Sequence, residues 1–383
     1  MCESPIPSSP RVDQIQMSSV AKVRFLNLAV SDDAMRENLL EAVDSVLRTG
    51  RVVMGPEVDK LEKALAENSN CAFAVAVGSG SSALYLALRC LDLEPSDEVI
   101  TTALSWVATF NAITANGATP VAVDIGADLN MSPEAIESSI TPKTRAIVAV
   151  HYTGLVCDMS PIMDIAERHG LDVVEDAAQA FSAERDGKRA GSFGRLAAFS
   201  MNPMKVFSAY GEAGAVVCNE ESLRERLAIL RHTGVVNREE CREISLNHKP
   251  DTIQAAMLLV ALRHLEDKIK RRRRIARDYT RELGSLMVCP EEPEGVRHIY
   301  YEYIIQCDRR DELRDFLESQ GIEVRIHHEI LMPDQPVYDD LPRRDFPMAT
   351  RAKGRILSLP CHEAMADGEP EYVIEAIRKF FST

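Results

Sequence analysis

The sequence feature that most constrains the fold is an alternation between short apolar runs and longer amphipathic stretches, which begins near Ala72. The runs are rich in Val and Ile and lie at residues 72–77, 98–102, 120–124, 145–150 and 171–176. The stretches between them have apolar residues at helical spacing and lie at 81–91, 106–116, 133–140 and 160–169. Nearly continuous apolar strands that alternate with helices predict a parallel sheet buried on both faces. Runs at 196–200 and 214–219 should add strands, and a helix should follow at 220–232.

The pattern changes in the last third of the chain. A helical stretch runs from 251 to about 283, and we interpret its basic run at 271–274 as a solvated helix face. A small α+β domain is predicted beyond it, with strands at 297–307 and 322–326, helices at 310–320 and 369–381, and a surface loop at 332–347. We therefore predict a flexible tail at 1–22, a large domain at 23–262, and a long linking helix with a small C-terminal domain at 263–383.

Composition excludes several classes of function. The 383 residues include 44 Lys and Arg against 59 Asp and Glu, a net charge of -15, so the chain has no overall attraction to nucleic acid or an anionic membrane. No apolar run is long enough to cross a bilayer, and residues 1–20 lack the apolar core of a signal peptide. The nine cysteines are scattered without a CxxC pair, which is typical of reduced thiols in the cytosol. We expect a cytoplasmic protein that acts on small molecules, with no metal, nucleic-acid or membrane partner.

A glycine-containing turn, Gly78 to Ser82, joins a predicted strand to a predicted helix. Its backbone N–H groups and the helix N-terminus could hold a phosphate, although a plain tight turn is the alternative. The GxGxxG spacing of a dinucleotide site is broken here, which argues against an NAD-dependent oxidoreductase.

Two charged residues follow other strands of the same sheet. Asp176 lies at the carboxyl end of a buried strand, where open α/β sheets bind ligands; a helix cap is the alternative. Glu175 and Gln179 beside it weaken that alternative, because three such groups are costly to desolvate without partners. Lys205 follows the strand at 196–200, and a buried lysine amine would have a lowered pKa and be nucleophilic; an ordinary exposed lysine is the alternative. A phosphate site, a strand-end carboxylate and a lysine together match the phosphate, pyridine nitrogen and aldehyde of pyridoxal phosphate.

These segments make the chain resemble a known family, the DegT/StrS sugar aminotransferases among the fold-type I pyridoxal-phosphate enzymes. The resemblance extends from about residue 47 to 381, and its motifs lie at 49–56, 78–82, 105–109, 175–179, 191–194, 199–205 and 247–256. It implies an α/β fold in which helices flank a mostly parallel seven-stranded sheet in the large domain, with a small α+β domain at the C-terminal end.

The resemblance also implies roles for individual residues. Lys205 would hold the cofactor as a Schiff base and move the proton during the reaction. Asp176 would pair with the pyridinium nitrogen, Trp106 would stack on the ring, and Gln179 would bind the phenolic oxygen.

Other positions would bind the cofactor phosphate, namely Gly80, Ser81 and Ser200. Asn247 would reach the phosphate of a neighbouring subunit, so the resemblance implies a homodimer with shared active sites. Lys249 stands where many relatives have arginine.

The implied reaction is transamination, because position 205 is lysine and not the histidine of a few dehydrating relatives. An amino acid, usually glutamate in this family, would leave its amine on the cofactor as pyridoxamine phosphate. The amine would then pass to a keto or aldehydo sugar, giving an amino sugar for lipopolysaccharide or another surface or secondary glycan.

The acceptor is less constrained, because residues 325–333 depart from the family's His-Tyr-Pro segment. Arg325, His327 and His328 could bind a carboxylate or phosphate of the acceptor, with a variable surface loop as the alternative. A carboxylate would fit a free 3-deoxy-octulosonate sugar acid; the alternative acceptor is a nucleotide-linked keto-deoxy sugar. A non-catalytic regulator that binds pyridoxal phosphate is the alternative from another class.

Overall fold

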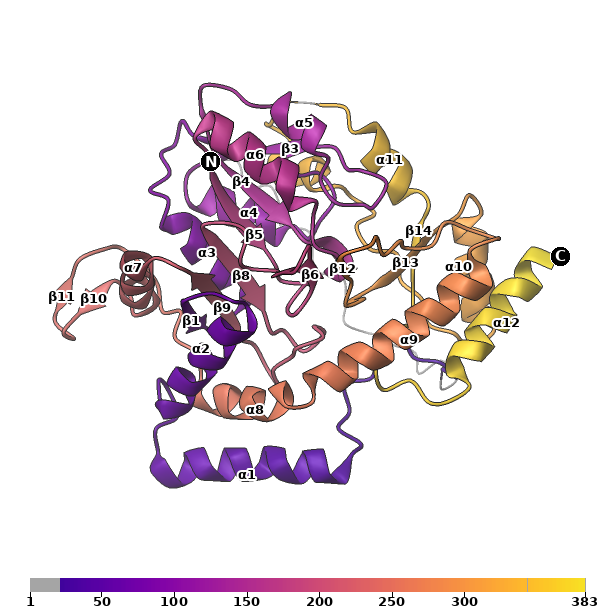
Figure 1. The fold of residues 1–383 in the computed structure, drawn as a ribbon, viewed down its shortest axis with the longest axis horizontal. Helices are drawn as coiled ribbons and strands as arrows, with labels where there is room; N and C mark the ends of the chain where they lie inside the picture. Colours follow the sequence, from indigo (N-terminus) through magenta and orange to yellow (C-terminus); the bar gives the residue numbers. More distant parts are fainter. Residues whose placement is uncertain (1–20, 343, 383) are drawn as a thin grey trace, which may run out of the picture.

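A seven-stranded sheet forms the centre of the molecule, in a computed structural model that describes residues 21–342 and 344–382 (Figure 1). The strand order is β1-β9-β8-β5-β4-β2-β3. Every predicted apolar run forms one of these strands, which are β1 Phe73–Val77, β2 Glu98–Thr102, β3 Thr119–Val123, β4 Thr144–Val150, β5 Asp172–Asp176, β8 Leu196–Ser200 and β9 Gly214–Cys218. Of the predicted tail at 1–22, residues 1–20 lie outside the described residues.

Most neighbouring strands in the sheet are parallel, which confirms the predicted α/β class. The exception is β9, which runs antiparallel to both β8 and β1. No helix separates β8 from β9 in the chain, and a short connection of this kind returns the chain in the opposite direction. That connection, residues 201–213, carries Lys205.

Helices cover both faces of the sheet. One apolar cluster joins the strands to α3 Gly80–Arg89, α4 Ala108–Ala115 and α7 Glu221–Arg231. A second cluster joins them to α2 Pro56–Asn68, α5 Pro133–Glu137, α6 Met159–His169 and α8 Thr252–Leu262.

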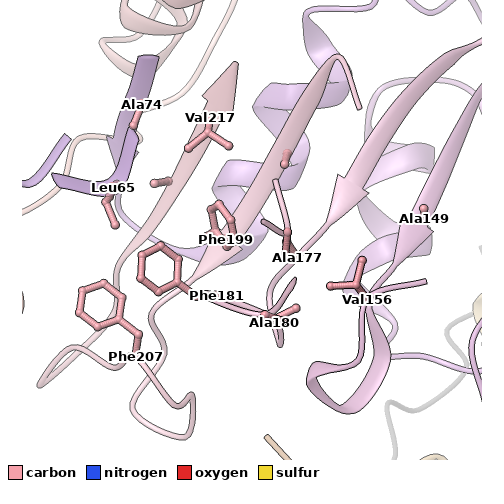
Figure 2. Packing of buried hydrophobic residues seen from close by; sticks show 14 of the residues in the cluster. Leu65, Ala74, Ala149, Val156, Ala177, Ala180, Phe181, Phe199, Phe207 and Val217 are labelled. Atoms are coloured by element: carbon pink, nitrogen blue, oxygen red, sulfur yellow. The ribbon is translucent and has the colours of Figure 1, made fainter. Parts of the chain in front are cut away.

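Three aromatic rings anchor the chain around Lys205 to this second cluster (Figure 2). The ring of Phe181 stacks on that of Phe207 at 4.7 Å between centroids and meets the edge of Phe199 at 5.1 Å. Val206 and Phe207 are buried directly after Lys205, so the position of the lysine is fixed by the core of the large sheet.

The predicted long helix at 251–283 is interrupted. Residues Arg263 and His264 separate α8 from α9, Leu265–Leu283. The sequence predicts that the basic run of α9 is a solvated helix face. This prediction fails for Arg272, which is only 2% exposed. Its guanidinium donates hydrogen bonds to the carbonyl oxygens of Tyr300 and Cys361, which ties two C-terminal segments together.

The C-terminal part has its own apolar core, built on the antiparallel pair β13 Tyr303–Gln306 and β14 Ile356–Leu359 with α10 Arg310–Ser319 and α12 Glu369–Ser382. The strand predicted at 297–307 is therefore shorter than expected. The strand predicted at 322–326 does not form, because its residues make only isolated bridges. Val23 packs in this C-terminal core, so we propose that the segment around it belongs with the small domain.

The remaining elements are short or peripheral. They are α1 Asp33–Thr49, β6 Glu184–Arg185, β7 Lys188–Arg189, β10 Val235–Val236, β11 Glu240–Cys241, β12 Val296–Arg297, α11 Pro347–Lys353, and the 3-10 turns η1 Tyr152–Gly154, η2 Met332–Asp334 and η3 Pro336–Tyr338. Within the described ranges, no helix has both the length and the apolar character to cross a membrane.

Candidate active site

A cavity of about 370 Å³, here called the main cavity, brings together residues from the sheet and from the C-terminal part. Its volume lies in the range of small-molecule sites. Nine of the residues predicted from the sequence line it, namely Gly80, Ser81, Trp106, Asp176, Gln179, Ser200, Lys205, His327 and His328.

The N-terminus of α3 forms one end of the main cavity. Ser79 caps the helix, since its hydroxyl accepts a hydrogen bond from Ser82 N at 3.1 Å. The N–H groups of Gly80 and Ser81 belong to the first turn, which has no helical acceptors for them. A Cβ on Gly80 would lie 2.4 Å from Ser200 Cβ, so only glycine lets this turn approach Ser200 so closely. The first turn of α3 therefore forms an anion-binding cradle, with the hydroxyl groups of Ser81 and Ser200 beside it.

Asp176 lies 7% exposed at the end of β5. Thr109 Oγ1 donates to its carboxylate at 2.8 Å, and Ala178 N donates to the other oxygen at 3.3 Å. Burial raises the pKa of Asp176, while these two hydrogen bonds act in the opposite direction. Among the residues that the structure describes, none forms an ion pair with this carboxylate, and a buried carboxylate of this kind is suited to receive a protonated ring nitrogen.

Lys205 is not an ordinary exposed lysine. Its Nζ lies 4.0 Å from the ring centroid of Tyr301, and burial lowers the pKa of its amine to about 8, against the opposing effects of Glu302, Asp176 and Glu212. A neutral amine is therefore accessible near physiological pH, which is the form that attacks an aldehyde.

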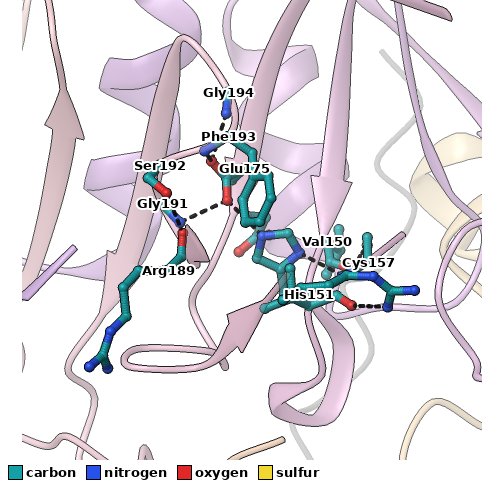
Figure 3. A network of polar contacts seen from close by, with 12 residues as sticks. Val150, His151, Cys157, Glu175, Arg189, Gly191, Ser192, Phe193 and Gly194 are labelled. Carbon is teal, nitrogen blue, oxygen red and sulfur yellow. Dashed lines mark hydrogen bonds and ion pairs between the residues drawn. The ribbon is translucent and has the colours of Figure 1, made fainter. Parts of the chain in front are cut away.

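Glu175, next to Asp176, serves the structure: its carboxylate points toward the loop at Gly191–Gly194 and toward His151 (Figure 3). Its carboxylate accepts hydrogen bonds from the backbone N–H groups of Gly191, Phe193 and Gly194, at 2.7 to 2.8 Å. His151 Nε2 lies 2.8 Å from the same carboxylate, and its Nδ1 accepts from Cys157 N, so the proton is on Nε2. This network satisfies the buried Glu175 and holds the end of β5 in place.

Gln179 and Trp106 occupy different depths of the site. Gln179 Oε1 accepts from Thr153 N at 2.7 Å, which leaves the amide NH2 group as the donor available to a ligand. Trp106 is 65% exposed at the edge of the cavity, so its indole face is open to a ring placed against it.

Two predicted residues do not line the main cavity of this chain. Asn247 is exposed, as its predicted role toward a neighbouring subunit requires, and that role stays a prediction. The guanidinium of Arg325 lies 4.7 Å from the ring of Phe25 and does not reach the cavity.

Sequence reasoning gave no site role to several other residues that line the cavity, among them Thr109, Glu212, Tyr301 and Glu302. One of them left a trace in the sequence. Glu302 is the single charged residue within an otherwise apolar and aromatic run, residues 299–305.

The residues present fit pyridoxal phosphate. A phosphate cradle that a Cβ would fill, a buried carboxylate and an amine of lowered pKa share one cavity, and these are the three groups the cofactor needs. The fold and the site together define a pyridoxal-phosphate-dependent transferase.

Residues 33–378 match the DegT/DnrJ/EryC1/StrS aminotransferase family, and the chain belongs to it. It is 36% identical over 366 residues to a pleiotropic regulatory protein of Geobacillus stearothermophilus, covering 94% of this chain and 98% of the relative. It is 35% identical over 364 residues to the dTDP-3-amino-3,4,6-trideoxy-alpha-D-glucose transaminase of Streptomyces venezuelae, covering 94% and 96%. It is 34% identical over 360 residues to the dTDP-3-amino-3,6-dideoxy-alpha-D-galactopyranose transaminase of Aneurinibacillus thermoaerophilus, covering 94% and 99%.

Solved structures agree with this assignment. S. venezuelae DesV, solved in complex with a ketimine intermediate, superposes with a TM-score of 0.91 at 35% identity, covering 94% of this chain and 99% of that one. The ntda protein from Bacillus subtilis, with bound cofactor PMP, gives 0.89 at 29% identity, covering 96% and 87%. The chain is thus an aminotransferase, and its cofactor is pyridoxal phosphate.

Proposed function

We propose that this aminotransferase moves an amino group from L-glutamate to the keto group of a nucleotide-linked deoxy sugar. The observation that carries the proposal is the meeting of Lys205, Asp176 and the Gly80–Ser200 cradle in one cavity. Sugar transamination agrees with the relatives, several of which are named for nucleotide-linked amino sugars.

The residues of this chain divide the work of the reaction. The cofactor, when bound, supplies an electron sink. Asp176 holds the proton of the ring nitrogen, and the cradle of α3 holds the phosphate and so fixes the ring in position. The Lys205 amine, with its pKa lowered to about 8, accepts and returns the proton of the reacting carbon.

Of the two acceptor hypotheses, the nucleotide-linked sugar has more support. A free octulosonate acid would be favoured by a cation for its carboxylate, and Arg325, the arginine predicted for that role, does not line the main cavity and packs on Phe25. We further propose that the protein is a cytoplasmic homodimer that supplies an amino sugar for lipopolysaccharide or another glycan.

The test is spectroscopic. The protein should bind pyridoxal phosphate as a yellow complex, lose the colour with glutamate and regain it with the correct keto sugar. Lys205→Ala should abolish the colour change and turnover, whereas Lys143→Ala, at an exposed lysine, should change neither. Colour that persists with every amino donor would favour the non-catalytic regulator.

A further inference from the structure

A buried acid, Glu302, forms part of the wall of the main cavity without a described role. It is 8% exposed and lies on the segment between the buried residues Ile299 and Tyr303. The preceding residue, Tyr301, places its ring against Lys205 Nζ, and Glu302 is one of the charges that act on the Lys205 pKa. Glu302 is therefore close to the reacting centre.

The hydrogen bonds of Glu302 are incomplete. Ser358 Oγ donates to its Oε2 at 3.3 Å. His327 Nε2 lies 3.3 Å from its Oε1, yet that nitrogen is buried and makes no hydrogen bond. Among the described residues, Glu302 has no Lys or Arg ion-pair partner. A carboxylate accepts about four hydrogen bonds, so Glu302 can accept more than it does here, and His327 Nε2 can still donate one. The cavity wall thus presents an acceptor and a donor side by side.

The charge of the cavity restricts what can bind there. Apart from its two histidines, its acidic and basic side chains, as far as the structure describes them, are Lys205, Asp176, Glu212 and Glu302. The proposed function assigns Lys205 and Asp176 to the cofactor, which leaves two acids facing the substrate and no arginine. A carboxylate at this wall would be repelled, whereas a hydroxyl group could donate to Glu302 and accept from His327.

We propose that Glu302, with His327 beside it, binds a hydroxyl group of the acceptor sugar next to the carbon that receives the amine. The inference rests on the proposed function and adds a residue that determines which sugars are accepted. It also gives the buried acid a further hydrogen-bond donor beside Ser358 and His327.

Two amino sugars allow the test, because dTDP-3-amino-3,6-dideoxy-alpha-D-galactopyranose and dTDP-3-amino-3,4,6-trideoxy-alpha-D-glucose differ only in the hydroxyl at carbon 4. Each would be converted in the reverse direction with 2-oxoglutarate. Glu302→Gln should raise KM for the amino sugar about tenfold or more, with kcat and the rate of the glutamate half-reaction within a few-fold of the wild type, because Glu302 also acts on the Lys205 pKa. The loss should be confined to the first compound if Glu302 binds the carbon-4 hydroxyl, and equal for both if it binds the hydroxyl at carbon 2.

A binding measurement separates recognition from chemistry. The pyridoxamine-phosphate form cannot react with an amino sugar, so calorimetry gives its dissociation constant directly, and Glu302→Gln should raise that constant by the same factor as KM. Glu329→Gln, an exposed acid two residues after His327, is the matched control and should change neither quantity.

The outcomes distinguish the two proposals. Unchanged KM and dissociation constants in Glu302→Gln, with an active wild type, would overturn the role of Glu302 alone. A fall in the glutamate half-reaction as large as the loss for the amino sugar would also overturn it, because Glu302 would then act mainly through Lys205 and not on the acceptor. A wild type that neither binds nor converts any nucleotide-linked amino sugar would overturn the proposed function and this inference with it.

Discussion

At the scale of single residues, the buried amine of Lys205 links stability to reactivity. Its pKa in the folded protein is about 8, below the ordinary 10.5, so between these values the unfolded chain binds more protons. Stability should therefore rise with pH from about 8 to 10.5. At pH 7, the charged amine should destabilise the cofactor-free fold.

The Lys205→Met variant tests this linkage. Without cofactor, its free energy of unfolding at pH 7 should exceed that of the wild type by up to about 3 kcal/mol, and the gain should shrink as the pH rises toward 10.5. Urea unfolding at several pH values measures both effects, with Lys143→Met as control. A gain that grows with pH would contradict the burial argument.

The site residues that could be predicted from the sequence are those that a single strand or helix of the large sheet carries into the site. Asp176 and Lys205 follow strands, and the carboxyl ends of strands in such sheets form the binding site. Tyr301 and Glu302 were missed because they meet Lys205 only when the C-terminal part folds against the sheet. The role of Arg325 stays a prediction, since His327 and His328 line the cavity whereas its own guanidinium lies 4.7 Å from the ring of Phe25.

At the scale of elements, the contact between α3 and β8 should tolerate no side chain at Gly80. Gly80→Ala would place Cβ 2.4 Å from Ser200 Cβ, so the helix must move and the phosphate cradle must open. We expect a loss of about 1–3 kcal/mol in unfolding free energy and weaker binding of pyridoxal phosphate. Gly354→Ala is the control, because its nearest atom would be 3.7 Å away. Equal cofactor affinity in both variants would refute the cradle.

The hydrogen bonds of Glu175 also connect elements, since they join the end of β5 to the loop at Gly191–Gly194 and to His151. Glu175→Gln would place an amide NH2 group against two of the present donors, either the N–H groups of Phe193 and Gly194 or those of Gly191 and His151 Nε2, leaving buried groups unsatisfied. Chemical denaturation should show a loss of about 3–5 kcal/mol. Glu220→Gln, which removes a partly exposed partner of Arg195, should cost about 1 kcal/mol or less. Similar losses in both would mean that the network contributes little.

Element boundaries show where local pattern stops being informative. The apolar runs of the sheet were predictable because burial on both faces removes polar residues from them. The antiparallel direction of β9 could not be predicted, since it is set by the connection from β8, residues 201–213, and not by the sequence of the strand. The helix α1 was missed because it packs mainly on α8, through Leu39 and Val46, and its apolar stripe is narrow.

At the scale of the whole molecule, large apolar side chains are exposed on α1, on the chain that follows it and on the segment at 244–246. Figure 1 shows α1 at the margin of the fold, beyond α8. Large apolar side chains are exposed on it and on two other segments, namely Leu40, Leu47, Val52, Val53, Ile244 and Leu246. Such surfaces in a chain of this size are typical of contacts between subunits, which agrees with the proposed homodimer.

Subunit mixing tests whether the active sites are shared. If Asn247 serves the neighbouring subunit, a heterodimer of Lys205→Ala and Asn247→Ala chains contains one site with both changes and one with neither. Differently tagged chains allow this heterodimer to be purified, and it should have about half the wild-type activity per dimer, far more than either parent homodimer. A heterodimer of Lys205→Ala with the wild type should also retain half. Should the mixed heterodimer be no more active than the Asn247→Ala homodimer, Asn247 acts within its own chain or elsewhere, and the shared site is refuted.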